Sequence, residues 1–191
     1  MNAGRSRSNN KIPPFTKDGV FPVGDYALTL GELRESPLVR GSQGSSTHWD
    51  IAWRRHLVDN LSVLVRQLWQ VGIAEIFIDG SFVEEKDHPN DIDGYFECDV
   101  MQLASGKLED ELNRLDPHQV WTWDPANRRS VPGTTKKQLP MWCQYCVELY
   151  PHYGQPSGIR DPQGNLLAFP AAFRLSRSGI PKGIIKIVPD S

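Results

Sequence analysis

The chain has 191 residues, of which 39% are hydrophobic, and its formal net charge at pH 7 is −2. This length suits one domain with a full core and is too short for two ordinary domains. No run approaches the roughly 18 apolar residues that a membrane span needs, so we expect no membrane partner. The three cysteines lack framework spacing and predict reduced thiols. The N-terminal stretch MNAGRSRSNNKIPPF has no apolar core, which predicts a cytoplasmic protein rather than a secreted one.

Charge is distributed unevenly along the chain. Residues 75–116 hold 13 acidic and three basic residues, a local net charge of −10. Basic residues gather at 5–11, 128–137 and 174–186. This distribution suits a metal–nucleotide site beside a polyanionic partner. It suits equally well an ordinary protein whose opposite charges face each other.

The first part of the chain predicts a tail followed by one domain. Residues 1–14 are small, polar and basic, which predicts a disordered basic tail. Residues 15–191 are then a single domain. Within it, Thr29 and Glu32 predict a capping box that opens a short helix reaching Glu35.

The clearest predicted helix runs from Thr47 to about Gln70 and ends at Gly72. Arg54 is expected outside its buried face. Apolar residues recur at spacings of three and four and predict one buried stripe. The stripe consists of Ile51, Leu57, Leu61, Leu64, Leu68 and Val71.

Residues 76–97, IFIDGSFVEEKDHPNDIDGYFE, predict two short strands joined by a turn. Asp91 and Asp93 share one face of the second strand because successive side chains alternate. Two carboxylates roughly 6–7 Å apart along a strand repel each other unless a cation lies between them. Mg²⁺ is commonly held by one or two carboxylates together with substrate phosphates. Gly80 and Ser81 end the first strand, where backbone N–H groups and a hydroxyl can approach a phosphate. A plain surface hairpin is the alternative interpretation.

The second half of the chain is less regular. Residues 100–115 predict a helix, and Trp121 and Trp123 lie in an irregular stretch beside basic residues. Tryptophans beside basic side chains suit either base stacking or the packing of a surface loop. Residues 141–150 predict a strand that carries Glu148 between two apolar residues, and residues 182–188 predict a closing strand. Lys182 in that strand points either at phosphate or at water.

The residues Gly80-Ser81 and Asp91-Ile92-Asp93 resemble the signature of the nucleotidyltransferase superfamily that includes DNA polymerase beta. That signature is a strand ending in Gly-Ser, two acids separated by one apolar residue, and a third acid on a later strand. More narrowly, GSFVEEKDHPNDID and FRLSRSGIPKGIIKIV resemble a family of short bacterial and phage proteins of nucleotidyltransferase-like fold. The resemblance implies an α+β fold with a mixed or antiparallel sheet and helices packed on one face. Glu148 stands where most relatives carry an aspartate.

The resemblance also implies an enzyme that moves a nucleoside monophosphate from a nucleoside triphosphate to an acceptor hydroxyl. The acceptor is a tRNA end or a protein side chain, and the role is related to a toxin–antitoxin system or to phage defence. The catalytic residues, which also bind Mg²⁺ or Mn²⁺, are then Asp91, Asp93 and Glu148. The residues that bind the triphosphate are then Gly80, Ser81 and Lys86. The alternative is a catalytically silent nucleotidyltransferase-like module that binds a nucleotide or a partner protein, and the oligomeric state is open.

Overall fold

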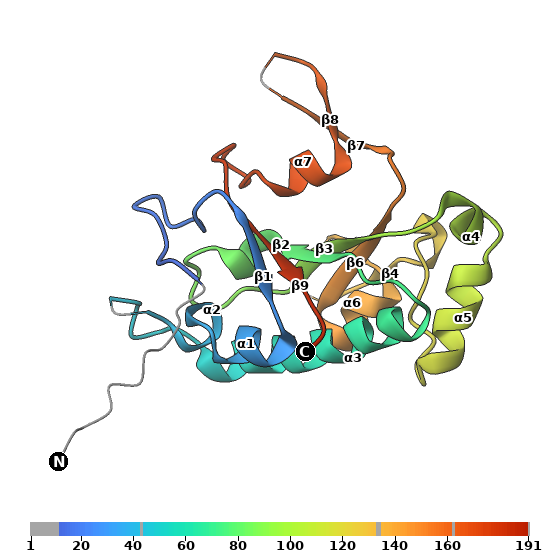
Figure 1. Cartoon of the computed structure of the whole chain (residues 1–191), viewed down its shortest axis with the longest axis horizontal. Coiled ribbons are helices and arrows are strands. Elements are labelled where there is room, and N and C mark those ends of the chain that lie inside the picture. Colours follow the sequence, from blue (N-terminus) through green and yellow to red (C-terminus); the bar gives the residue numbers. More distant parts are fainter. Residues whose placement is uncertain (1–11, 43, 133–134, 162, 191) are drawn as a thin grey trace.

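The computed structural model describes residues 12–42, 44–132, 135–161 and 163–190 (Figure 1). Its centre is a five-stranded sheet with the order β1-β9-β2-β3-β6. The strands are β1 (Asp25–Leu28), β2 (Ile76–Asp79), β3 (Ile92–Glu97), β6 (Val147–His152) and β9 (Ile184–Ile187). Strand β2 is antiparallel to both β3 and β9, whereas β1–β9 and β3–β6 are parallel pairs. The sheet is therefore mixed, and the α+β class is confirmed.

Most helices cover one face of this sheet (Figure 1). They are α1 (Leu30–Glu35), α2 (Pro37–Arg40), α3 (Ile51–Gln70) and α6 (Pro140–Tyr145). On the other face lie the short helix α7 (Phe169–Phe173) and the hairpin of β7 (Pro156–Arg160) and β8 (Leu166–Ala168) (Figure 1). The central sheet therefore has a covered face and a face capped by the C-terminal segment.

The remaining elements lie after β3. Helices α4 (Val100–Ala104) and α5 (Lys107–Leu115) replace the single helix predicted over 100–115. Gly106 separates them with a φ of +75°, a left-handed conformation that does not continue a helix. The short 3-10 helix η2 (Pro125–Asn127) precedes a small hairpin of β4 (Arg129–Ser130) and β5 (Lys137–Gln138).

Helix α3 supplies the core beneath the sheet. It begins at Ile51, later than the predicted Thr47, because the carboxylate of Asp50 caps it by accepting a hydrogen bond from Trp53 N. It ends at Gln70 as predicted, and Gly72 follows with a φ of +86°. The central part of the predicted stripe is fully buried, namely Leu57, Leu61, Leu64 and Leu68. Ile51 is 39% exposed and lies outside it.

Arg54 was expected outside the buried face of α3, and this prediction is wrong. Its side chain is fully buried and donates hydrogen bonds to the backbone carbonyls of Leu38, Phe82, Glu84 and Lys86 at 2.5–3.2 Å. Burial is compatible with the charge because each of these carbonyls gains a donor. Arg54 therefore ties α3 to the loop that follows β2.

Other predictions are tested by the described residues. The capping box of Thr29 and Glu32 is present and opens α1. The stretch 141–150 is not one strand, since α6 ends at Tyr145, its C-cap residue Cys146 has a φ of +52°, and β6 follows it. Residues 1–11 of the predicted tail lie outside the described part of the chain, while Ile12 is 3% exposed within the core. None of the described helices has the length and apolar composition to cross a membrane.

Candidate active site

Three acidic residues lie in one row across neighbouring strands of the sheet. The register pairs Asp79 of β2 with Asp93 of β3, and Asp93 with Glu148 of β6. Directly paired residues project from the same face of a sheet, so the three carboxylates share one face. Ile76 and Ile78 of β2 alternate with Asp79 and pack in the core with α3. The row therefore lies on the face beneath α7.

Gly80 permits a close approach between the end of β2 and Asp93. It has a φ of +75°, and a Cβ placed there would lie 2.4 Å from Asp93 Oδ2. The following residues 80–83 form the 3-10 helix η1 (Gly80–Val83). The structure thus brings the predicted Gly80-Ser81 corner against the carboxylate of Asp93.

Lys182 is the basic side chain at this corner. Its ammonium group donates hydrogen bonds to Gly80 O at 2.9 Å and to Glu84 Oε1 at 2.7 Å. It also lies 3.1 Å from Asp79 Oδ1, and both side chains are almost completely buried. Among the described residues, Asp79 Oδ1 has no hydrogen-bond partner. Its contact with Lys182 is therefore an ion pair that lacks the geometry of a hydrogen bond. No sequence pattern indicated a role for Asp79, and the pattern around Lys182 left its side chain directed either at phosphate or at solvent.

The two acids beside Gly80 hold their protons unusually tightly. Burial raises the pKa of Asp79 to about 7, and the nearby charge of Lys182 offsets only part of this increase. The pKa of Asp93 is also raised, first by burial and then by the negative charges of Asp91, Glu148 and Asp79. Carboxylates in such surroundings are stabilised in their charged form by an added cation.

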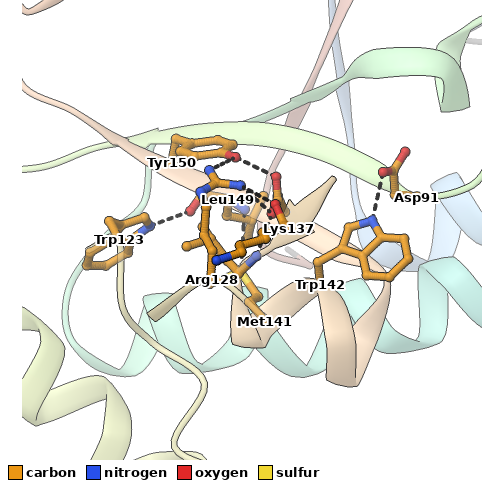
Figure 2. Close-up of polar contacts among 10 residues, drawn as sticks. Asp91, Trp123, Arg128, Lys137, Met141, Trp142, Leu149 and Tyr150 are labelled. Atoms are coloured by element: carbon orange, nitrogen blue, oxygen red, sulfur yellow. Dashed lines mark hydrogen bonds and ion pairs between the residues drawn. The ribbon is translucent and has the colours of Figure 1, made fainter. Parts of the chain in front are cut away.

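Asp91 directly precedes β3 and lies two residues before Asp93. Its Oδ2 atom accepts a hydrogen bond of 2.8 Å from Trp142 Nε1 on α6, as Figure 2 shows. Strand β3 begins at Ile92, so no strand pairing tests the prediction that Asp91 and Asp93 share one face. The carboxylate of Asp91 turns towards Trp142, and Asp91 does not line the cavity beside Asp93.

Glu148 has a different set of partners. It is 6% exposed and accepts hydrogen bonds from the hydroxyl of Tyr150 and from Leu139 N, the latter at 3.2 Å. Arg128 lies 3.9 Å from Glu148 Oε1 and donates a hydrogen bond of 3.3 Å to Tyr150 Oη (Figure 2). Burial, followed by the charge of Glu148, raises the pKa of Tyr150, which keeps its hydroxyl protonated as a donor. Glu148 is therefore held by polar partners at the edge of the row.

A cavity of about 250 Å³ opens beside Asp79 and Asp93. Most of its charged and polar lining comes from the sheet and from the corner after β2, with Ser157 and Arg177 added by the C-terminal segment, which also supplies the apolar lining. The polar residues are Asp79, Gly80, Ser81, Glu84, Asp93, Ser157, Arg177 and Lys182. The apolar residues are Ile159, Phe169, Ala172, Phe173 and Leu175.

Lys86 and the two tryptophans considered for base stacking lie elsewhere. Lys86 is exposed and lines a separate surface pocket with Asp87 and His88, because the loop after η1 leads it away from the sheet. Trp121 is fully buried and donates to Gln67 Oε1 at 2.6 Å, so it has no face available for a base. Trp123 is partly buried and donates to Leu149 O at 2.8 Å (Figure 2). Both tryptophans therefore serve packing rather than base stacking.

The fit of the site to a divalent cation is partial. The donors are all carboxylate oxygens, the type of ligand that Mg²⁺ prefers. Within the described part of the chain, no group of three or more acidic, histidine or cysteine side chains is arranged to hold a metal ion. The carboxylates of Asp91 and Glu148 accept hydrogen bonds from Trp142 and Tyr150 instead. One or two carboxylates suffice for Mg²⁺ when substrate phosphates supply the other oxygens.

The fold and the cavity together define an α+β protein with a buried carboxylate row at the end of an antiparallel strand pair. The chain belongs to the DUF6932 family, described as a family of unknown function, whose model matches residues 13–188. Neither the curated proteins nor the solved structures contain a match to the chain.

Proposed function

We propose that this protein is a metal-dependent nucleotidyltransferase. The observation that carries the proposal is the strand register. It sets Asp93 beside Glu148, with Asp91 two residues earlier and the corner at Gly80 against Asp93. This is the arrangement that the resemblance to the nucleotidyltransferase superfamily implies. The cavity beside Asp93 and Gly80 supplies the concave, partly apolar space in which ligands bind.

Each residue has a role in this proposal. Asp91 and Asp93 hold Mg²⁺ or Mn²⁺ together with the phosphates of a nucleoside triphosphate. The ion, when bound, neutralises charge that develops on the phosphates during transfer. The backbone N–H groups of Gly80 and Ser81 and the Ser81 hydroxyl contact the phosphates, and Glu148 accepts the proton of the acceptor hydroxyl.

The reaction balances without a further reactant. The oxygen of the acceptor hydroxyl forms a bond to the α-phosphorus, the bond from that phosphorus to the pyrophosphate breaks, and pyrophosphate leaves. The acceptor is the hydroxyl of a tRNA end or of a protein side chain. A role in a toxin–antitoxin system or in phage defence agrees with either acceptor.

A second candidate function is a module that binds a nucleotide without transferring it. The partners of Asp91 and Glu148 favour this candidate, because Trp142 and Tyr150 occupy oxygens that a catalytic metal needs. Binding alone requires only the cavity, the corner at Gly80 and the carboxylate of Asp93.

The test compares two acids of β3 that differ in burial. Purified full-length protein is incubated with Mg²⁺ or Mn²⁺ and each α-labelled nucleoside triphosphate, with and without total tRNA. We expect transferred label with the wild type and a loss of at least about 100-fold with Asp93→Asn, because a metal-bound carboxylate is removed. The exposed Glu97 lies on the same strand, and Glu97→Gln should retain the wild-type rate.

The outcomes separate the two candidate functions. Transfer that Asp93→Asn leaves at the wild-type rate contradicts the assignment of the site. Saturable binding of a nucleoside triphosphate without transfer, under all of these conditions, supports the silent module instead. Absence of both binding and transfer refutes both candidates.

A further inference from the structure

The cavity has two chemically different ends. The sheet and the corner after β2 form a charged floor around Asp79, Asp93 and Lys182. The apolar roof comes from α7, which lies over one face of the sheet (Figure 1), and from residues on either side of this helix in the sequence. A ligand that matches both ends carries a charged group and a flat or compact apolar group.

Helix α7 is unusual because its sequence, FPAAF, is entirely apolar, yet none of its residues is buried. The rings of Phe169 and Phe173 lie 5.2 Å apart. Phe173 packs against Tyr95 of β3 at 5.3 Å, and Phe169 stacks on His152 of β6 at 5.7 Å with an interplanar angle of 12°. These contacts anchor α7 on the sheet and still leave apolar surface directed at the cavity, which a ligand ring would cover.

The floor indicates where the charged part of such a ligand lies. Gly80 and Ser81 present a tight corner, Lys182 lies beneath it, and Arg177 lines the cavity from the C-terminal side. The acidic groups at this end require a cation between themselves and an anionic ligand. The charges therefore suit a metal-bound polyphosphate at the floor, with its apolar remainder directed at the roof.

We propose that α7 forms the wall that binds the nucleobase of the nucleoside triphosphate. The base lies against Phe169 and Phe173, and the phosphates lie at Gly80 and Ser81. Aromatic side chains bind bases in this way because every base presents a π face. A cavity of about 250 Å³ is smaller than the roughly 300–1,000 Å³ of sites for drug-sized ligands, so it encloses only part of a nucleoside triphosphate. This inference rests on the proposed function and adds to it the residues that hold the base.

The test places a larger side chain at the apolar roof of the cavity and leaves the charged residues of the floor unchanged. Ala172 lines the cavity, whereas its neighbour Ala171 is not among the lining residues. We therefore compare Ala172→Phe with Ala171→Phe in the full chain. Calorimetry measures binding of ATP, GTP, CTP, UTP and inorganic tripolyphosphate, each with Mg²⁺. Tripolyphosphate has the charged groups of the triphosphates and no base.

We expect Ala172→Phe to weaken the tightest-binding nucleoside triphosphate by at least about tenfold, because base stacking of this kind contributes about that much or more. Tripolyphosphate binding should stay within about twofold of the wild type, and Ala171→Phe should change neither ligand. Phe173→Leu removes one ring of the wall without filling the cavity. It should weaken the same nucleotide selectively and keeps the test decisive if Ala172→Phe lowers the melting temperature.

Failure of this inference is distinguishable from failure of the proposed function. Equal losses for tripolyphosphate and nucleotide, or no loss in either variant, overturn the base wall while transfer of label still supports the enzyme. A selective loss of nucleotide binding in a protein that transfers no label supports the base wall and favours the silent module. A wild-type chain that binds no nucleotide overturns both.

Discussion

The stability of this protein should depend on pH through Asp79, and Asp79→Asn should remove that dependence. The Asp79 side chain is 2% exposed, and its pKa is raised to about 7. Asparagine has nearly the same shape and does not titrate. Lys182 keeps its hydrogen bonds to Gly80 O and Glu84 Oε1 in the variant, so the corner at Gly80 retains its support.

The sign and size of the effect follow from the two pKa values of Asp79. Its unperturbed pKa is 3.8 and its pKa in the folded protein is about 7, so between these values the folded state holds more protons than the unfolded state. The free energy of unfolding therefore falls as pH rises through this window and levels off above it. The interval from pH 5 to the folded-state pKa of about 7 spans two pH units. At roughly 1.4 kcal/mol per unit, the free energy of unfolding falls by about 3 kcal/mol over this interval. The charge of Asp79 also raises the pKa of Asp93, so Asp79→Asn reduces the contribution of Asp93 as well.

Urea titrations followed by tryptophan fluorescence measure this effect, since the chain contains six tryptophans. The wild type should lose about 3 kcal/mol of unfolding free energy between pH 5 and pH 8 at this site, and Asp79→Asn should lose much less. Glu97→Gln, an exposed acid on β3, should keep the wild-type dependence. If Asp79→Asn retains the full dependence, the titrating group is elsewhere and the argument from burial is refuted.

Two further predictions concern Arg54 and Trp142. Arg54→Met should lower the free energy of unfolding by about 3–5 kcal/mol, because four backbone carbonyls lose a buried charged donor. Urea unfolding measures this loss, with Arg66→Met as the exposed control. Equal losses in the two variants would contradict the role of Arg54. Binding of Mn²⁺ at Asp91 should change the intrinsic fluorescence, because Trp142 Nε1 donates to Asp91 Oδ2. This change should disappear in Trp142→Phe, and its persistence there would place the ion away from Asp91.

Local patterns were sufficient to predict several elements from the sequence. The paired strands around Gly80 and the capping box at Thr29 depend on residues close together in the chain. The position of Glu148 beside Asp93 was expected from the resemblance, and the register agrees with it. Periodicity and turn chemistry act over a few residues, which explains why these features are readable.

The contacts of the site depend on long-range packing that local patterns do not contain. Lys182 reaches the corner from about 100 residues away, and its burial follows from the packing of β9 against β2. Arg54 appears as one more polar residue on a helix until the loop after β2 supplies its acceptors. One local signal was present at Asp79. This acid ends an apolar strand directly before a glycine, a pattern that indicates a polar strand end where another group can approach the backbone closely.

The buried pair of Asp79 and Lys182 is better explained by what it positions than by its effect on stability. A carboxylate whose pKa is raised to about 7 destabilises the folded state when it ionises, even with an ammonium group 3.1 Å away. Lys182 lies between α7 and β9; its N–H donates to Arg174 O at 2.9 Å, and its ammonium group donates to Gly80 O. One residue therefore connects, through its backbone and its side chain, the segment that forms the roof of the cavity to the corner that forms its floor. Apolar residues of similar volume would pack there without this cost, but they would not fix the distance between the two ends of the proposed nucleotide site.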